Sequence, residues 1–164
     1  MGLAAEATAR LTGFVSLAAG AMVLLTQAVI VPRLGWPPRR LIRTGIPVAI
    51  VGFGMLVPDL GFGAVLVGMA LAGLGLGIAM PGYMAGPTLL VEHGEQGGVA
   101  GLISSTNALS FVAGPLVGTA LYDLRPVAPF LVSVGVLALL AVFVVVNPVI
   151  RRGDRPVEGA PPAV

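Results

Sequence analysis

The stretch GGVAGLISSTNALSFVAGPLVGTALYD, residues 97–123, combines small residues, hydroxyl groups and an amide within an otherwise apolar run. Drawn as a helix, it collects these side chains on one face about 100° wide. That face holds Ser104, Asn107, Phe111, Gly114, Pro115, Gly118 and Tyr122. A face of this composition suits a protein-lined cavity or another helix better than a lipid surface.

The two halves of that face differ in chemistry. Ser104 and Asn107 offer a hydroxyl and an amide, whereas Gly114 and Gly118 have the four-residue spacing that lets two helix backbones approach closely in lipid. Pro115 has no N–H to donate to the preceding turn, which predicts a bend there. We therefore expect a polar cavity end and a small-residue packing end on one bent helix.

Composition indicates that the solvent of this protein is largely lipid. Of its 164 residues, 57% are hydrophobic and 10% charged, and the mean hydropathy is +1.02. The pI of about 9.9 does not indicate a nucleic-acid partner, because the arginines gather where apolar runs end. The predicted fold class is an all-α integral membrane protein, with the lipid bilayer as its first partner.

Five apolar runs define the predicted organisation. We expect a lead at residues 1–10, a transmembrane domain at 11–147 and a disordered cytoplasmic tail at 148–164. The predicted spans, which form a bundle of five transmembrane helices, are 11–31, 41–58, 65–90, 98–122 and 127–146. A cleaved signal peptide is the alternative for the first run, but that run exceeds a normal signal core and lacks a clear cleavage site before Pro32.

Polar side chains inside the spans are the candidates for a substrate cavity. Gln27 would be costly to expose to lipid, so it faces either a cavity or a neighbouring helix through a plain hydrogen bond. Tyr83, beside Met84, follows Pro81 at an expected kink and could contact a ligand, with simple packing as the alternative. With Ser104 and Asn107 these form the candidate set.

Small residues recur along the third span and predict a packing seam. They are Gly68, Ala72, Gly75, Ala79, Gly82 and Gly86. We expect the Gly75, Ala79 and Gly82 part of this stripe to meet Gly114 and Gly118. The second and fifth spans nearly lack polar side chains and are expected to face lipid.

Chemistry of the kind enzymes use is absent from the spans. No His, Asp, Glu or Cys lies within any of them, so we expect neither an enzyme nor a resident cofactor or metal. Glu92, His93 and Glu95 lie together in a short connection, where a solvated turn is a better interpretation than a metal site.

Positive charge predicts the orientation. One set of loop ends carries Arg33, Arg39, Arg40, Arg43, Arg151, Arg152 and Arg155, and the opposite set carries Arg10 and Arg125. Because cytoplasmic loops are enriched in arginine, the first set is predicted to be cytoplasmic, with the N-terminus outside and the chain in the plasma (inner) membrane.

Three motifs, taken in order, resemble those of a known family. Arg33-Leu34-Gly35 with Arg39-Arg40 resembles a basic loop between the second and third helices of a transporter half. Gly73-Leu-Gly75-Leu-Gly77 with Pro81 resembles its fourth helix, and Gly114-Pro115-x-x-Gly118 its fifth-helix antiporter motif. The chain is similar to the C-terminal half of a major facilitator superfamily transporter, most like the drug-efflux proton antiporters.

The resemblance implies part of a secondary active transporter that exports small amphipathic organic molecules. Ala28 and Pro32 replace the family's opening Gly and Asp in the basic loop, so a charge-relay role there is not implied. A family half has six helices and a transporter has two halves, which implies a partner: a missing N-terminal half or another membrane chain. The alternative function is a small membrane assembly or anchoring subunit that uses its glycines only to bind helices.

Overall fold

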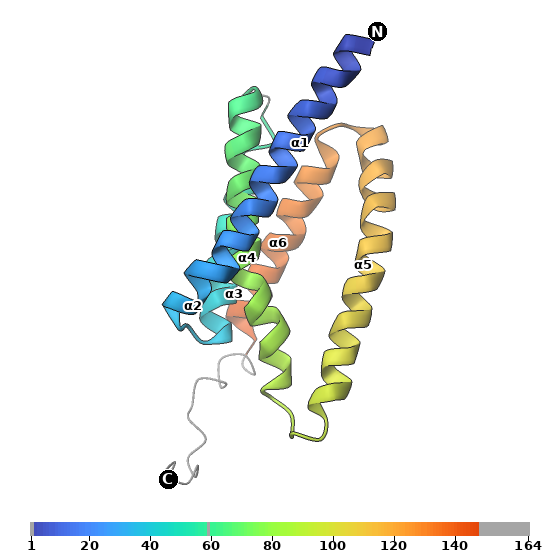
Figure 1. Ribbon diagram of the computed structural model, residues 1–164. Helices are drawn as coiled ribbons and strands as arrows, with labels where there is room; N and C mark the ends of the chain where they lie inside the picture. Colours follow the sequence, from blue (N-terminus) through green and yellow to red (C-terminus); the bar gives the residue numbers. More distant parts are fainter. Residues whose placement is uncertain (1, 59, 148–164) are drawn as a thin grey trace.

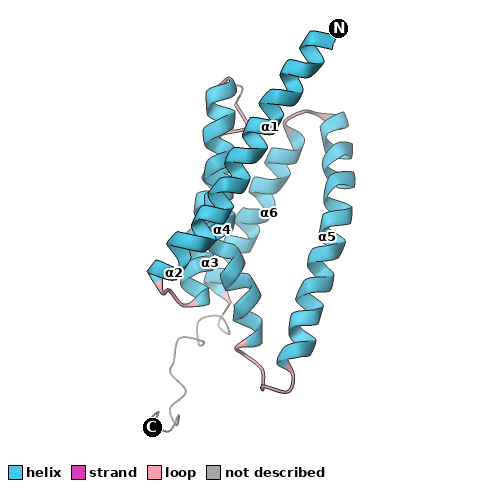
Figure 2. Cartoon of the chain, in the orientation of Figure 1, coloured by secondary structure: helices cyan, strands magenta, loops and turns pink. Residues whose placement is uncertain are grey.

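The computed structural model describes residues 2–58 and 60–147, and every regular element within these ranges is a helix. In chain order they are α1 (Gly2–Leu25), the π-helical turn η1 (Thr26–Ile30), α2 (Val31–Leu34), α3 (Pro38–Gly54), α4 (Phe62–Thr88), α5 (Gln96–Leu124) and α6 (Ala128–Val146). The long helices run up and down between two ends of a bundle (Figures 1 and 2). The predicted all-α class is confirmed for these residues, and the predicted tail at 148–164 lies outside them.

The long helices suit a membrane by their length and composition. The segments long and apolar enough to cross one are Glu6–Leu34, Phe62–Thr88, Gln96–Leu124 and Ala128–Val146. Helix α3 has 17 residues, which at 1.5 Å per residue is about 26 Å, slightly less than a hydrocarbon core of about 30 Å. Large apolar side chains point outward, as for Phe111, which is 77% exposed. An apolar exterior of this kind matches a lipid solvent.

Helices α1 and α2 form one segment interrupted by the turn η1. The N–H of Val31 donates to the carbonyl of Thr26, five residues back, instead of four. Pro32 follows at once and has no N–H for a regular α-helical bond, so the wider turn accommodates the proline within the segment. Gly35, with a positive φ of 55°, then ends α2, and Pro37 precedes the first turn of α3.

The tightest contact in the bundle is between α3 and α4. A Cβ atom added to Gly45 would lie 2.5 Å from the carbonyl oxygen of Gly75, and one on Gly52 would lie 2.7 Å from that of Gly68. Only glycine permits such an approach, because a side chain would separate the two backbones. We call this surface the α3–α4 seam; it comprises Gly45, Ala49, Gly52, Gly68, Ala72, Gly75, Ala79 and Gly82.

The seam corrects the expectation that the second span only faces lipid. Helix α3 buries Leu41, Gly45, Ile46 and Ala49, while Val51 on its other side is 57% exposed. After Thr44 the span has no polar side chain, because its small residues pack against α4 and its apolar residues pack against its neighbours or face outward. An apolar sequence alone does not distinguish these two environments.

Helix α1 crosses α4 through a second set of glycines. A Cβ atom on Gly73 would lie 2.5 Å from the carbonyl oxygen of Ala19, and one on Gly77 would lie 2.9 Å from the Cβ of Thr26. Thr26 is fully buried, and its hydroxyl donates to the carbonyl of Met22 at 2.6 Å. The buried hydroxyl is therefore satisfied within its own helix.

Helix α5 stands apart from the rest of the bundle. It joins α4 and α6 through loops at its two ends, and its ribbon lies away from both over most of its length (Figure 1). Ile103 is its only buried residue within the described part of the chain. Helix α6 packs on α3 and buries only Val144, which agrees with the expected lipid-facing character of the fifth span.

Candidate substrate-binding site

Gln27, the first candidate, lies in the π-helical turn η1. Its neighbour Thr26 packs against Gly77 of α4, while the Gln27 side chain itself is exposed. Within the described residues the Gln27 amide makes no hydrogen bond, so the predicted alternative of a bond to a neighbouring helix is not present here. Single π-turns inside helices often occur at functional sites.

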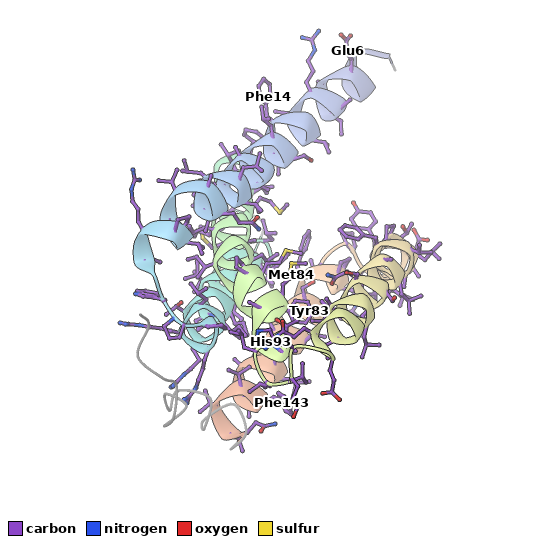
Figure 3. All side chains as sticks on the ribbon, turned by 60° about the horizontal axis from the view of Figure 1, so that its bottom comes forward. Glu6, Phe14, Tyr83, Met84, His93 and Phe143 are labelled. Atoms are coloured by element: carbon purple, nitrogen blue, oxygen red, sulfur yellow. The ribbon has the colours of Figure 1, made fainter. Side chains whose placement is uncertain are left out.

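Tyr83 lies near the end of α4, on its exposed side. Its side chain is 39% exposed and that of Met84 is 45% exposed. Figure 3 shows both on the side of α4 toward α5, rather than in the α3–α4 seam. Both interpretations of Tyr83, ligand contact and packing, therefore stay predictions.

Helix α5 contains two classes of polar side chain. The hydroxyls of Ser105, Thr106, Ser110 and Thr119 each donate to the backbone carbonyl four residues earlier, at 2.5 to 2.9 Å. Such bonds satisfy a hydroxyl inside its own helix, which makes it tolerable in lipid. In contrast, Ser104 and Asn107 make no hydrogen bond to any described residue. These two require a partner from elsewhere.

The four candidates share two properties. All are polar groups without a hydrogen-bond partner among the described residues, and all lie toward the same end of the bundle. Gln27 and Tyr83 lie late in helices that run toward that end, while Ser104 and Asn107 lie in the first half of α5, which runs away from it (Figure 1). The structure does not join them into one enclosed cavity, because α5 stands apart from α1 and α4.

The predicted packing residues divide between two helices. Gly75, Ala79 and Gly82 belong to the α3–α4 seam, and Gly82 contacts the Pro38 carbonyl. Among the described residues, no atom beyond α5 lies within 4 Å of a Cβ placed on Gly114 or Gly118. The predicted contact between these two sets is therefore wrong, because α3 already occupies the α4 stripe.

The predicted proline kinks receive no direct support from the helix assignment. Helix α4 continues through Pro81 and Pro87, and α5 continues through Pro115. Each proline removes one backbone donor without ending its helix. A bend at these positions stays a prediction.

The basic loop is built by the end of α2 and the start of α3. Arg33 is exposed at the end of α2, and Gly35 turns the chain toward α3. The Arg40 guanidinium carbon lies 4.4 Å from the centroid of the Trp36 ring, a cation–π geometry. A hollow of about 590 Å³, which we call the arginine hollow, is lined by Pro37, Arg39, Arg40, Arg43 and Thr44.

Sequence reasoning did not identify the roles of Trp36, Arg43 and Thr26 at these places. Arg43 was counted only as a topological charge, although it lines the arginine hollow. Trp36 lies between Gly35 and Pro37. The sequence signal for its contact with an arginine was Arg40, four residues later on the first turn of a helix. For η1 the signal was Pro32, because a proline inside a helical run removes the regular donor.

Comparison with known protein families identifies the family of this chain. The family model described as Major Facilitator Superfamily matches residues 2–163. The chain belongs to the major facilitator superfamily. Comparisons with curated proteins and with solved structures gave no match.

Membership of the major facilitator superfamily explains the general character of the molecule. Members of this family are multi-pass membrane transporters, not enzymes. Within the described residues, no group of three or more His, Cys, Asp or Glu could hold a metal ion.

Proposed function

We propose that this superfamily member lines one side of the substrate pathway in a secondary active transporter, and that the transporter exports small amphipathic organic molecules. The observation that carries the proposal is the set of unpartnered polar groups at Gln27, Tyr83, Ser104 and Asn107 in otherwise apolar helices. Polar groups at membrane depth are costly unless they meet water, a ligand or another chain.

The chemistry of that set favours amphipathic substrates. It offers an amide from Gln27, a phenol from Tyr83, and a hydroxyl and an amide from Ser104 and Asn107, surrounded by exposed apolar residues. These groups donate and accept single hydrogen bonds but carry no charge. Multiply charged ions and sugars would need more polar groups than this set contains.

A second bundle of helices completes the proposed pathway. Alternating access needs two bundles that rock around a central site, and α5 exposes nearly its whole surface. The spans predicted from the sequence contain no His, Asp, Glu or Cys that could carry a coupling proton. We therefore assign ion coupling to the second bundle, either a further part of the protein or another membrane chain.

The alternative is an assembly or anchoring subunit that would use its glycine surfaces to bind other helices. That alternative relied on glycine stripes left available for other helices. The α4 stripe is instead used within the chain, against α3 and α1. Gly114 and Gly118 stay open, as do glycines such as Gly13, Gly20 and Gly135, and they lie on the same helix as the unpartnered Ser104 and Asn107.

The test is dye accumulation in host cells with and without the gene. Deletion should raise the intracellular level of amphipathic cationic dyes, and restoring the gene should lower it in a manner sensitive to an uncoupler. The purified chain alone, reconstituted in vesicles, should export no dye, because it has no opposing bundle. Unchanged dye levels together with a stable homo-oligomer would favour the assembly subunit instead.

We also propose that the end of the bundle bearing the arginine hollow is cytoplasmic. The basis is the arginine asymmetry between the two ends. Because the chain has no native Cys, single cysteines at Gly94 and Leu124 report opposite ends; both residues are exposed. In intact cells an impermeant thiol reagent should label Leu124→Cys and leave Gly94→Cys unlabelled. The reverse pattern would invert the orientation.

A further inference from the structure

Two neighbouring hollows at one end of the bundle share a side chain. The arginine hollow holds about 590 Å³ at the start of α3. A narrow groove of about 60 Å³ between α3 and α6 is lined by Arg43, Ile46, Pro47, Ala141, Val144 and Val145. We call it the α3–α6 groove. Arg43 lines both, so a cationic space continues directly into an apolar one.

We propose that this pair of hollows binds an anionic phospholipid, with its phosphate in the arginine hollow and part of an acyl chain in the α3–α6 groove. This lipid site is separate from the proposed substrate pathway, since neither hollow is lined by Gln27, Tyr83, Ser104 or Asn107.

The charge of the arginine hollow selects an anion. Arg39, Arg40 and Arg43 line it, and no acidic side chain is among the described residues that line it. The Thr44 hydroxyl donates to the carbonyls of Arg40 at 2.8 Å and Leu41 at 3.2 Å, so the positive charge of the hollow comes from its arginines, with Arg40 and Arg43 as the proposed donors to a bound molecule. Guanidinium groups form paired hydrogen bonds with phosphate oxygens, which fits a phosphate diester.

The surroundings favour a lipid phosphate over a soluble one. Trp36 lies beneath Arg40, and Trp is enriched at the depth of lipid headgroups. Basic pockets between transmembrane helices commonly bind anionic headgroups. Apart from Arg43, the side chains that line the groove between α3 and α6 are apolar, so it supplies an apolar path. Inorganic phosphate would leave that groove unused.

The proposal is tested by lipid titration of the purified full chain in a neutral detergent, followed by native mass spectrometry. Dioleoylphosphatidylglycerol should form a one-to-one adduct, whereas dioleoylphosphatidylcholine, with no net charge, should bind at least several-fold more weakly. Glycerol phosphate, which has the headgroup but no chains, should not displace the bound phosphatidylglycerol at millimolar concentration.

Matched variants separate the hollow from general surface charge. Arg43→Gln should weaken the apparent Kd for phosphatidylglycerol about five-fold, the effect of one arginine near an anionic lipid surface. Arg33→Gln removes the same charge at the same end of the bundle, outside the hollow, and should change it less than about two-fold. Equal losses from Arg33→Gln and Arg43→Gln would overturn the proposal in favour of non-specific attraction.

A second pair of variants tests the groove. Ala141→Leu should fill it and weaken phosphatidylglycerol binding, while Ala138→Leu, on an exposed part of the same helix, should not. Thermal stability of each variant without added lipid checks that the fold is retained. If Ala141→Leu binds phosphatidylglycerol like the parent and glycerol phosphate competes fully, the hollow is a site for soluble anions and the lipid assignment is wrong.

Discussion

Helices α4 and α5 contain glycines at similar spacings, yet their surroundings are opposite. On α4, Gly68, Gly75 and Gly82 lie so close to α3 that no side chain would fit without moving the backbone. On α5, Gly114 and Gly118 have no atom of another element within 4 Å. Glycine spacing thus indicates that a helix can be approached closely, and the connectivity of the chain decides which helix does so.

The difference separates stability from function. The α3–α4 seam joins two helices that are consecutive in the chain. It holds the molecule together through van der Waals contact, since lipid provides no hydrophobic drive between helices. The open surface of α5 contributes little to the isolated chain. Four predictions test this contrast, beginning with the largest expected change in stability.

Gly45→Leu should be the most damaging substitution. Even its Cβ would lie 2.5 Å from the Gly75 carbonyl oxygen, a backbone atom that cannot rotate away. Overpacking typically costs about 1–3 kcal/mol, and we expect the upper end of that range. Gly54→Leu is the control, because it adds the same side chain to α3 where no atom lies within 4 Å. Thermal unfolding in detergent measures both. Similar stabilities would mean that the seam is not close-packed.

Gly77→Ala should destabilise the chain by about 1–2 kcal/mol, because its methyl group would lie 2.9 Å from the Thr26 Cβ of η1. Gly63→Ala, near the start of α4, meets nothing within 4 Å. Alanine is the better helix former by roughly 0.5–1 kcal/mol, so this control should be slightly more stable than the parent. A gain from Gly77→Ala like that of Gly63→Ala would show that α1 does not cross α4 here.

Hydropathy made the helices predictable, because the length of an apolar run and its bounding Gly, Pro and Arg residues are local properties. The turn at Gly35 and the start of α4 after Gly61 both coincide with positive φ values that favour glycine. Polar side chains such as Gln27 and Asn107 were identifiable for the same reason. They stand out against apolar neighbours.

Pairings between helices could not be predicted in the same way. The stripe at Gly75 and Gly82 could have met any small surface, and the sequence offered both α3 and α5. Likewise, the sequence shows that Ser104 and Ser105 are hydroxyls, but only the structure shows that Ser105 is bonded to the Gly101 carbonyl and Ser104 is not. Such distinctions depend on rotamers and neighbours.

Asn107→Leu should change stability by no more than about 0.6 kcal/mol, the average for a hydrogen bond between membrane helices. Asn107 has no partner among the described residues, so even this small loss is an upper limit for the isolated chain. Dye export in cells should nevertheless change, with a shift in the preferred dyes. The control is the converse substitution, Leu109→Asn, which adds an amide at an exposed position of the same helix. Unfolding of Asn107→Leu in detergent would show that the amide is structural.

Gly118→Leu has the smallest expected effect on the isolated chain, below about 0.5 kcal/mol, because nothing lies within 4 Å of its Cβ position and positions away from contacts usually tolerate substitution. Dye export in cells is a separate measurement, because it also depends on any helix that contacts α5 at Gly118. If a second bundle approaches Gly118 closely, the leucine should abolish export while leaving the purified chain as stable as the parent. Gly135→Leu on α6, equally open, should leave both unchanged.

The two measurements on Gly118→Leu therefore decide what the open surface of α5 is for. Loss of export without loss of stability would place a close helix contact there, supplied from outside the described residues. Loss of stability in the purified chain would instead mean that α5 folds back onto α4, so that Gly114 and Gly118 contact the rest of the bundle after all. Unchanged export and unchanged stability would leave that surface to lipid, and the second bundle would then have to approach through α1 or the exposed side of α4, where Gln27 and Tyr83 lie.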